Sequence, residues 1–277
     1  MNKKVLYSLL AFTVVSVSAS VSASTITNLD LTSATPFGGF DWSQNGTAIS
    51  TPGPAYKDGD TITTVYFADA VAIDKTGGGS FTTPNMLTSA PGAGFAVGQY
   101  EYTIAAQITE IISGCGGLCT GAATFTPTGG TFNVYYDYFG LAGGNTVANQ
   151  ITGSGFTDGA LLLSGSILPE GGSTYNPIIG SGSFQYAGPV SYTNSNYITP
   201  DQTNQLNTST LQFGSSNTNW TAALASPFGS LPVSNIQFQA DGNQTFSATS
   251  IPEPGSLALL GIGMLGLFAA RKRDKIN

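Results

Sequence analysis

Residues 100–109 read YEYTIAAQIT, and this stretch does most to decide the fold class. Apolar side chains recur at every second position, namely Tyr100, Tyr102, Ile104, Ala106 and Ile108. Polar residues such as Glu101, Thr103 and Gln107 occupy most of the positions between them. Because successive side chains of a β-strand point to opposite faces, the pattern predicts a strand with one face on a hydrophobic core and the other in water.

The same alternation recurs in residues 131–138, which read TFNVYYDY. Five further stretches are strand candidates: residues 61–71, 160–167, 182–186, 208–213 and 235–240. The segments between them carry turn-forming residues: Gly77-Gly78-Gly79, Pro91-Gly92, Asp158-Gly159, Gly171-Gly172 and Asp241-Gly242. We predict an all-β fold with an antiparallel β-sandwich or jelly-roll-like body, and an irregular barrel as an alternative of the same class.

Cations are scarce between residues 24 and 250. This part contains two of them, Lys57 and Lys75, against 13 acidic residues, which gives a net charge of −11. Such a body cannot neutralise phosphates, so the composition excludes nucleic-acid binding. The acidic residues either attract divalent cations or, as the simpler interpretation, form a solvated surface.

The first 23 residues have the pattern of a secretory signal. Two lysines precede an apolar run over residues 5–17, and residues 21–23 read VSA, a small-residue cleavage pattern. We predict a cleavable N-terminal signal helix with cleavage between Ala23 and Ser24, and a second choice after Ala19. A retained membrane anchor is the alternative, although the apolar run is short for a span.

An uncharged run of 16 residues extends over residues 255–270. As a helix it would span about 24 Å, which is less than the roughly 30 Å of a bilayer core. Pro252 and Pro254 prevent the helix from extending upstream, and the basic residues at 271–273 favour the cytoplasmic side. We predict a short C-terminal transmembrane helix that holds the body outside the inner membrane. A short core-facing helix is the alternative.

This tail resembles the PEP-CTERM sorting signal of Gram-negative bacteria over residues 251–275. The resemblance is carried by Pro252-Glu253-Pro254, by SLALLG at residues 256–261 and by Arg271-Lys272-Arg273, in the order that the family shows. It implies that an exosortase recognises and removes the tail, and that the protein is then delivered to the cell surface or to extracellular polymer. It implies little about the body, because bodies in this family differ widely.

The patterns divide the chain into three parts. We expect a secretory signal peptide at residues 1–23, a β-rich extracytoplasmic domain at residues 24–247 and a sorting signal at residues 248–277. Residues 77–98 and 192–207 are rich in turn-forming or polar residues, and they are either linkers or long loops of one domain.

Cys115 and Cys119 are the two cysteines of the chain, with three residues between them. In an oxidising compartment this pair is expected to form a disulfide across the connection after the first strand described above. A redox pair would have a two-residue gap and a neighbouring cation, and a metal site would need two more ligands. Free thiols and a metal or redox function therefore remain as the weaker alternatives.

The chain contains no histidine. This composition removes Ser-His-Asp and Cys-His catalysis and the usual zinc enzymes. A glycosidase with paired carboxylates is the remaining enzymatic possibility, and Glu101 and Glu110 are its obvious acids. Nine positions apart on one strand, they are expected to project from opposite faces, and solvated surface positions are the simpler interpretation of both.

Two weaker ligand sites remain as hypotheses. Asp58 and Asp60 are weak calcium candidates, because a turn can gather carboxylates and carbonyls, but they lack the spacing of a calcium loop. Exposed aromatic residues would offer a carbohydrate-stacking platform, with these candidates: Trp42, Tyr135, Tyr175, Tyr197 and Trp220. Core packing is the simpler interpretation of these rings.

From these patterns we predict an exported, non-enzymatic protein with a structural or adhesive role in exopolysaccharide, biofilm or floc. A carbohydrate-binding module for exopolysaccharide and a secreted carboxylate-dependent glycan hydrolase are the alternatives. No cofactor and no bound metal are expected. The expected partners are the exosortase, the secretion machinery, the inner membrane through the tail, and exopolysaccharide, and the expected location of the mature form is the cell surface or the extracellular space.

Overall fold

The computed structural model describes residues 24–27, 35–51, 56–88, 95–139, 146–176, 181–199, 201–213, 225–230 and 236–247 of the 277-residue chain. These residues form strands, bridges and turns, which confirms the all-β class. Within them no helix is long and apolar enough to cross a membrane. The expected signal helix and C-terminal transmembrane helix lie outside the described residues.

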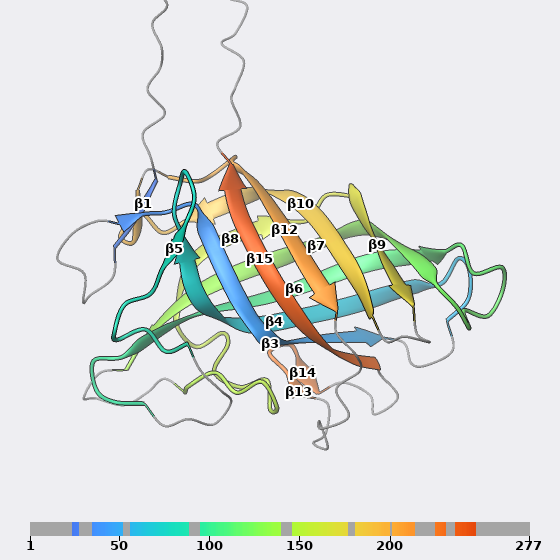
Figure 1. The fold of residues 1–277 in the computed structure, drawn as a ribbon, viewed down its shortest axis with the longest axis horizontal. Helices are drawn as coiled ribbons and strands as arrows, with labels where there is room; N and C mark the ends of the chain where they lie inside the picture. Colours follow the sequence, from blue (N-terminus) through green and yellow to red (C-terminus); the bar gives the residue numbers. More distant parts are fainter. Residues whose placement is uncertain are drawn as a thin grey trace, which may run out of the picture.

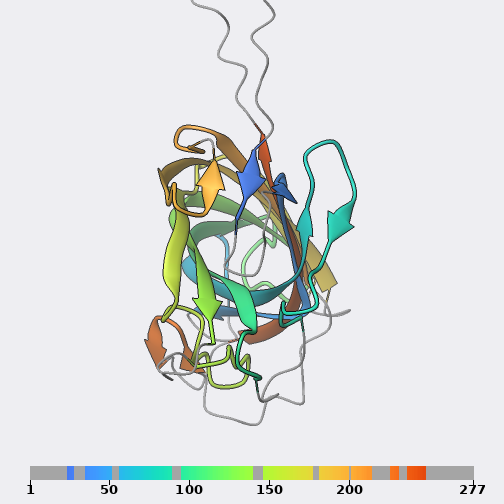
Figure 2. The ribbon, with the colours of Figure 1, turned by 90° about the vertical axis from the view of Figure 1, so that its left-hand side faces the viewer.

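Eight strands build the body, and each pairs antiparallel with the next of the eight along the chain. They are β3 (Gly39–Thr51), β4 (Thr61–Asp74), β6 (Tyr100–Ser113), β7 (Ala123–Tyr138), β8 (Ala160–Ser166), β10 (Ser181–Thr193), β12 (Leu206–Phe213) and β15 (Ile236–Ser247). The last strand, β15, pairs with the first, β3, so the sheet closes into an up-and-down barrel (Figures 1 and 2).

The predicted sandwich or jelly-roll is therefore wrong, and the barrel alternative is the correct architecture. Strands β15 and β3 pair from Ile236↔Ser50 to Thr245↔Gly39, which joins the two ends of the sheet. Alternating side chains do not distinguish the two architectures, because a sandwich and a barrel each place one face of every strand inward.

One position in the barrel wall is filled by two strands in succession. Strand β8 pairs with one half of β7, and β9 (Gly171–Asn176) pairs with the other half. Both also pair with β10. Strands β8 and β9 thus act as one interrupted strand. The break lies near a bulge in β7, which is located opposite Thr109 and Glu110 of the partner strand β6.

Six short strands lie outside the barrel wall. Strands β1 (Thr25–Ile26), β2 (Thr35–Pro36) and β11 (Ile198–Thr199) form a small sheet, β5 (Ser80–Phe81) pairs with the end of β4, and β13 (Ala225–Ser226) and β14 (Gly229–Ser230) form a hairpin. Strands β5 and β11 lie in the two segments, residues 77–98 and 192–207, that the sequence left open as linkers or loops.

The interior of the barrel is packed with large side chains, many of them aromatic. On β6 the residues at even positions from Tyr100 to Ile112 face inward, as the alternation predicted. Inward-facing rings form a contact chain in which Phe40 lies 4.9 Å from Trp42 and 5.3 Å from Tyr102, measured between ring centroids. A filled interior of this kind is typical of a barrel of eight strands.

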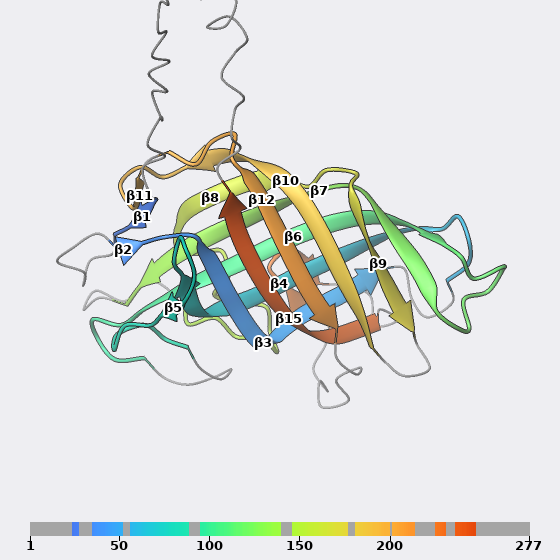
Figure 3. The same cartoon turned by 45° about the horizontal axis from the view of Figure 1, so that its top comes forward.

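The two ends of the barrel differ. At one end the small sheet places Ile26 and Ile198, both 0 % exposed, over the interior, together with Phe37. At the other end, where β3 ends and β4 begins, the wall is formed by β9 and the ends of β6 and β7 (Figures 1 and 3). A pocket occupies this second end.

Some local predictions are wrong. Strand β3 was missed, and its alternation is interrupted by bulges on both sides of Trp42. Asp241-Gly242 and Gly171-Gly172 lie inside strands rather than in turns. At Gly242 a Cβ atom would lie 2.5 Å from the hydroxyl oxygen of Tyr66, so glycine is required by close packing against the interior rather than by a turn.

Candidate functional site

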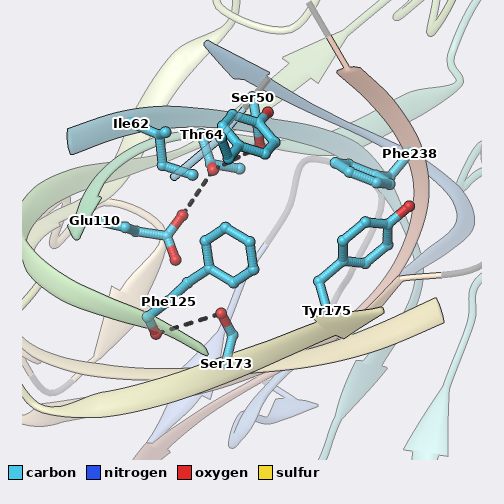
Figure 4. Close-up of a pocket in the computed structure, with 9 residues that line it drawn as sticks. Ser50, Ile62, Thr64, Glu110, Phe125, Ser173, Tyr175 and Phe238 are labelled. Atoms are coloured by element: carbon cyan, nitrogen blue, oxygen red, sulfur yellow. Dashed lines mark hydrogen bonds between the residues drawn. The ribbon is translucent and has the colours of Figure 1, made fainter. Parts of the chain in front are cut away.

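A partly open pocket lies at the end of the barrel away from the small sheet, and the empty space in and around it, open solvent included, amounts to about 330 Å³ (Figure 4). Its polar wall consists of Ser50, Thr64, Glu110 and Ser173. Its aromatic wall consists of Tyr56, Phe125, Tyr175 and Phe238. These residues come from β3, β4, β6, β7, β9 and β15 and from the connection between β3 and β4.

Strand register brings the polar side chains together. Ser50 on β3 pairs with Thr64 on β4, and Glu110 on β6 pairs with Ile62, two positions before Thr64. Residues two apart on a strand share a face, so the Glu110 and Thr64 side chains both point into the barrel. Glu110 continues the inward face of β6 between Ile108 and Ile112.

A directed chain of hydrogen bonds ends on Glu110. Thr64 Oγ1 donates to Glu110 Oε2 at 2.7 Å, and the oxygens of Ser50 and Thr64 are 2.9 Å apart. Because Thr64 gives its single proton to Glu110, Ser50 must donate to Thr64. The other carboxylate oxygen, Oε1, is buried without a hydrogen-bond partner among the described residues, and the carboxylate points into the pocket in Figure 4.

The ionisation of the pocket follows from its burial. Burial raises the pKa of Glu110 to about 7, and the hydroxyls of Thr64 and Ser173 offset part of this rise because they favour the charged form. Burial also raises the pKa of Tyr56, and the neighbouring Tyr175 and Glu110 add to the rise. Near neutral pH both the protonated and the ionised forms of Glu110 are therefore populated, and the phenol of Tyr56 is neutral.

The aromatic wall is made of two pairs of rings in edge-to-face contact. Tyr175 and Phe238 have ring centroids 4.6 Å apart at an interplanar angle of 71°, and Tyr56 and Phe125 have centroids 6.4 Å apart at 89°. Tyr175 is 8 % exposed and Phe238 is 6 % exposed. In Figure 4 the rings of Tyr175 and Phe238 lie across the pocket from Glu110.

A second group of buried acids lies on the outside of the barrel. Residues 146–159, called here the covering loop, cross the outer face of β4, β6 and β7 and bury three acids: Asp69, Glu101 and Asp137. The amide of Ala148 donates to Glu101 Oε1 at 2.8 Å, and Gln150 Nε2 donates to Asp69 Oδ1 at 2.5 Å. The covering loop therefore supplies hydrogen-bond donors to the acids that it buries.

The covering loop is fixed to the barrel by apolar and polar contacts. Phe156 packs on Phe67 with ring centroids 4.9 Å apart, and its carbonyl accepts a hydrogen bond of 2.9 Å from Thr103. Gly155 has φ of +80°, in the left-handed region, and a Cβ atom there would lie 2.3 Å from the carbonyl oxygen of Thr146. Glycine at this position therefore lets the loop turn back on itself.

Burial raises the pKa of Glu101 to about 9. The hydrogen bond from Ala148 opposes the rise, whereas the negative charges of Asp137, Asp69 and Asp158 add to it. Burial also raises the pKa of Asp69. The sequence interpretation of Glu101 and Glu110 as solvated surface residues is wrong, because they are 2 % and 3 % exposed. Their predicted projection from opposite faces of the strand is confirmed.

Comparison with known protein families identifies one segment of the chain. Residues 250–273 match the family described as PEP-CTERM protein-sorting motif. The chain carries a PEP-CTERM sorting motif. No curated protein and no solved structure matches the chain. The motif indicates an exported protein that is targeted to an exosortase, and it indicates passage through the inner membrane to the cell surface or the extracellular space.

The residues predicted for processing lie almost wholly outside the described residues. This holds for Pro252, Glu253, Pro254, Arg271, Lys272, Arg273 and Ala23, whereas Ser24 is the first described residue. Strand β15 ends at Ser247, shortly before the PEP-CTERM motif, and its Thr245 pairs with Gly39 at the start of β3. The motif therefore follows the end of the barrel that is opposite to the pocket.

Cys115 and Cys119 are joined as a disulfide with Cα atoms 4.9 Å apart. The weak calcium candidate Asp58 lies beside them, and its carboxylate accepts hydrogen bonds from the amides of Cys115 at 2.9 Å and Gly116 at 2.8 Å. Asp60 accepts a hydrogen bond from the amide of Lys57 at 3.1 Å. The carboxylate of Asp58 thus joins the β3–β4 connection to the disulfide loop, and that of Asp60 stabilises its own turn. The disulfide sulfurs are not free thiolates for a metal.

The aromatic candidates do not form one platform. Trp42 is 1 % exposed inside the barrel, and Tyr197 packs against the core beside Tyr136. Tyr135 is half-buried on a strand of the wall, and Trp220 lies outside the described residues. Tyr175 is the one candidate that lines the pocket.

Sequence reasoning missed most of the pocket. Ser50 and Phe238 carry no local signal of a site, because they come together only through the closing pair of strands, β15 and β3. The signal that was available is at Glu110, which falls in step with Ile108 and Ile112 on the apolar face of the predicted strand. An acid on the core-facing side of an amphipathic strand indicates a buried and therefore unusual carboxylate.

Proposed function

We propose that this PEP-CTERM protein is a non-enzymatic component of the cell surface or extracellular matrix, with a structural or adhesive role in exopolysaccharide, biofilm or floc. The sorting motif supports export and handling by an exosortase. A closed barrel with a filled interior supports a stable body, because closure leaves no open edge between its eight strands. A disulfide adds to this in an oxidising compartment.

The observation that carries the proposal is that the sorting motif and the pocket belong to opposite ends of the barrel. The sorting motif follows β15 at one end of the barrel, and the pocket with Glu110 and Tyr175 lies at the other. A barrel held at the membrane through its tail would therefore present its pocket on the side away from the membrane. This arrangement suits a protein that contacts matrix at its distal end.

A role without catalysis is supported by the geometry of the acids. Hydrolysis of a glycosidic bond commonly uses two carboxyl groups about 5–10 Å apart on either side of the bond. Glu110 is the one acid that lines the pocket among the described residues, and Glu101 lies on the opposite face of β6. The glycan-hydrolase alternative would need a second acid in the same pocket.

Carbohydrate binding is the second candidate function, and the pocket is the observation that favours it. The hydroxyl groups of Ser50, Thr64 and Ser173 line the same pocket as the rings of Tyr175 and Phe238. A combination of polar groups with aromatic faces is what a sugar ring requires, since it has hydroxyl edges and apolar faces.

Intact-mass spectrometry of the protein from its native host tests the proposal. We expect the mature mass to lack residues 1–23 and the tail after about Pro252 to Pro254, and this loss to depend on the exosortase. Cell-surface fractions should contain the processed form, and its removal should weaken the matrix. A mature protein that retains its tail in the presence of the enzyme, or matrix that is unchanged without the protein, would contradict the proposal.

A further inference from the structure

We propose that the pocket at the distal end of the barrel binds a protonated organic amine, with its ammonium group held between the Glu110 carboxylate and the surrounding aromatic rings. This inference goes beyond the structural or adhesive role, and it does not depend on that role. Amino sugars and small alkylamines share the required group. Three features of the pocket support it: an unmatched buried carboxylate, the lack of a cation beside it among the described residues, and the chemistry of the pocket wall.

The carboxylate of Glu110 is only half satisfied by the protein. Oε2 accepts the hydrogen bond from Thr64, but Oε1 has no partner among the described residues, and the side chain is 3 % exposed. A buried acceptor without a donor is unfavourable, and a buried negative charge without a counter-charge is more so. The pocket therefore favours an occupant that brings hydrogen-bond donors and positive charge to Oε1.

The residues that the structure describes supply no such charge at the pocket. Between residues 24 and 250 the cations are Lys57 and Lys75, and neither lines the pocket. Lys57 is exposed, and Lys75 lies 5.5 Å above the ring of Phe81, measured from Nζ to the ring centroid. The counter-charge for Glu110 must therefore come from a proton or from a ligand.

The wall of the pocket selects an organic cation over a metal ion. Calcium takes six to eight oxygen ligands and magnesium about six, whereas a single carboxylate and a few hydroxyls are present here. Four aromatic rings line the pocket instead, those of Tyr56, Phe125, Tyr175 and Phe238, and the faces of such rings attract ammonium groups. A carboxylate opposite several aromatic rings is a typical environment for an alkylammonium group.

The polar side of the pocket also provides acceptors for N–H donors. The hydroxyl oxygen of Ser173 lies 3.5 Å from the carbonyl oxygen of Phe125 and also close to Glu110, whose pKa it lowers, and its lone pairs can accept N–H donors. The hydroxyl of Tyr56 is buried without a hydrogen-bond partner among the described residues. Together with Oε1 of Glu110, these oxygens can accept hydrogen bonds from the three N–H groups of a primary ammonium ion.

Binding of matched pairs of ligands to the purified exported protein tests this inference. The pairs are butylamine with butan-1-ol, and a glucosamine trisaccharide with its N-acetylated counterpart, so that each pair differs mainly in charge. Isothermal titration calorimetry at pH 7, where Glu110 and the amines of the glucosamine trisaccharide are both partly ionised, should show the charged member of at least one pair binding about tenfold more tightly than the neutral member. The pair that responds identifies the source of the amine.

Variants assign the effect to the pocket. Glu110→Gln should abolish the preference for the charged ligand, whereas Glu101→Gln, a buried acid on the other face of the same strand, should keep it. Phe238→Leu should weaken the charged ligand more than the neutral one, which provides a second readout where Glu110→Gln fails to fold. Equal binding within both pairs, no binding of either charged ligand, or a preference that survives Glu110→Gln in a folded protein would overturn the inference.

Discussion

Two buried glutamates on the same strand have opposite environments. Glu101 lies on the outer face of β6 beneath the covering loop, and Glu110 lies on the inner face in the pocket. Both are almost fully buried, and burial raises the pKa of both. They differ in what covers them, because the chain itself donates to Glu101 through Ala148, whereas Oε1 of Glu110 faces an opening.

The difference shows that burial of an acid does not by itself indicate a binding site. Glu101 is enclosed by protein atoms, with Phe156 packed on Phe67 beside it. Its raised pKa is a consequence of attaching the covering loop to the barrel. Glu110 has the same kind of shift, but its unmatched oxygen is directed into a pocket. The presence of a pocket beside the unmatched oxygen therefore separates the two roles.

The largest expected effect comes from detaching the covering loop. Phe156→Ala removes the ring that packs on Phe67, and truncation of a buried Phe destabilises proteins by about 3–5 kcal/mol. We expect a loss of this size in denaturant unfolding and faster hydrogen exchange at the amide of Ala148. The control is Phe228→Ala, because Phe228 is 42 % exposed and its loss should change stability little. Similar losses in both variants would show that the loop is not held by Phe156.

The sequence predicts the strands well where the alternation is regular. Strands β6 and β7 combine an apolar inner face with a polar outer face, and both were located correctly. Strand β3 was missed, because bulges beside Trp42 break the two-residue period. Closure of the barrel could not be predicted, since it depends on pairing between β15 and β3, which are about 190 residues apart in the chain.

The candidate site was predictable only in part. Glu110 was singled out, yet its place in step with Ile108 and Ile112 was read as a surface position, and this signal was therefore not used. Glu101 lies on the polar face of the same strand, and nothing local to it indicates burial. Its cover comes from residues 146–159, more than 40 positions away, and their placement depends on tertiary packing.

The next effect concerns the dependence of stability on pH. The pKa of Glu101 is about 9 in the folded state against 4.5 as its ordinary value, so the folded protein binds more protons between these pH values. Its contribution to stability is therefore complete below about pH 4.5 and is lost as the pH rises toward 9. Glu101→Gln should remove part of this loss, about 3 kcal/mol between pH 5 and pH 8.

Urea unfolding at pH 5 and pH 8 measures this difference. The wild-type protein should be less stable at pH 8, and Glu101→Gln should be the more stable of the two proteins at that pH. Glu170→Gln is the matched control, because Glu170 is exposed and should leave the pH dependence of the wild type in place. A wild-type stability that is equal at both pH values would contradict the assignment.

A smaller effect is expected at the pocket end from loss of the disulfide. The combined replacements Cys115→Ser and Cys119→Ser open a small loop, which should lower the free energy of unfolding by about 2 kcal/mol in the chain-entropy model. The amide of Cys119 donates to the carbonyl of Tyr56 at 2.7 Å, so ligand binding at the pocket should weaken as well. Hydrogen exchange in the covering loop should stay unchanged, and faster exchange there would show that the two regions are coupled.

The smallest effect isolates the hydrogen bond that favours ionised Glu110. Thr64→Val keeps the shape of the side chain but removes the donor to Oε2, so the pKa of Glu110 should rise above about 7. The loss of stability should be about 1–2 kcal/mol at pH 8, and smaller at pH 5, where Glu110 is protonated. The pKa can be followed by carbon-13 NMR, since residues 24–250 contain three glutamates, Glu101, Glu110 and Glu170.

The matched control for this variant is Thr63→Val, one position away on the outer face of β4. It should leave the pKa of Glu110 unchanged, because the side chain of Thr63 points away from the pocket. An unchanged pKa in Thr64→Val would mean that Glu110 is already neutral near pH 8 or draws its donors from elsewhere. In either case burial alone would determine the ionisation of Glu110, as it does for Glu101. The contrast between the two faces of β6 would then be lost.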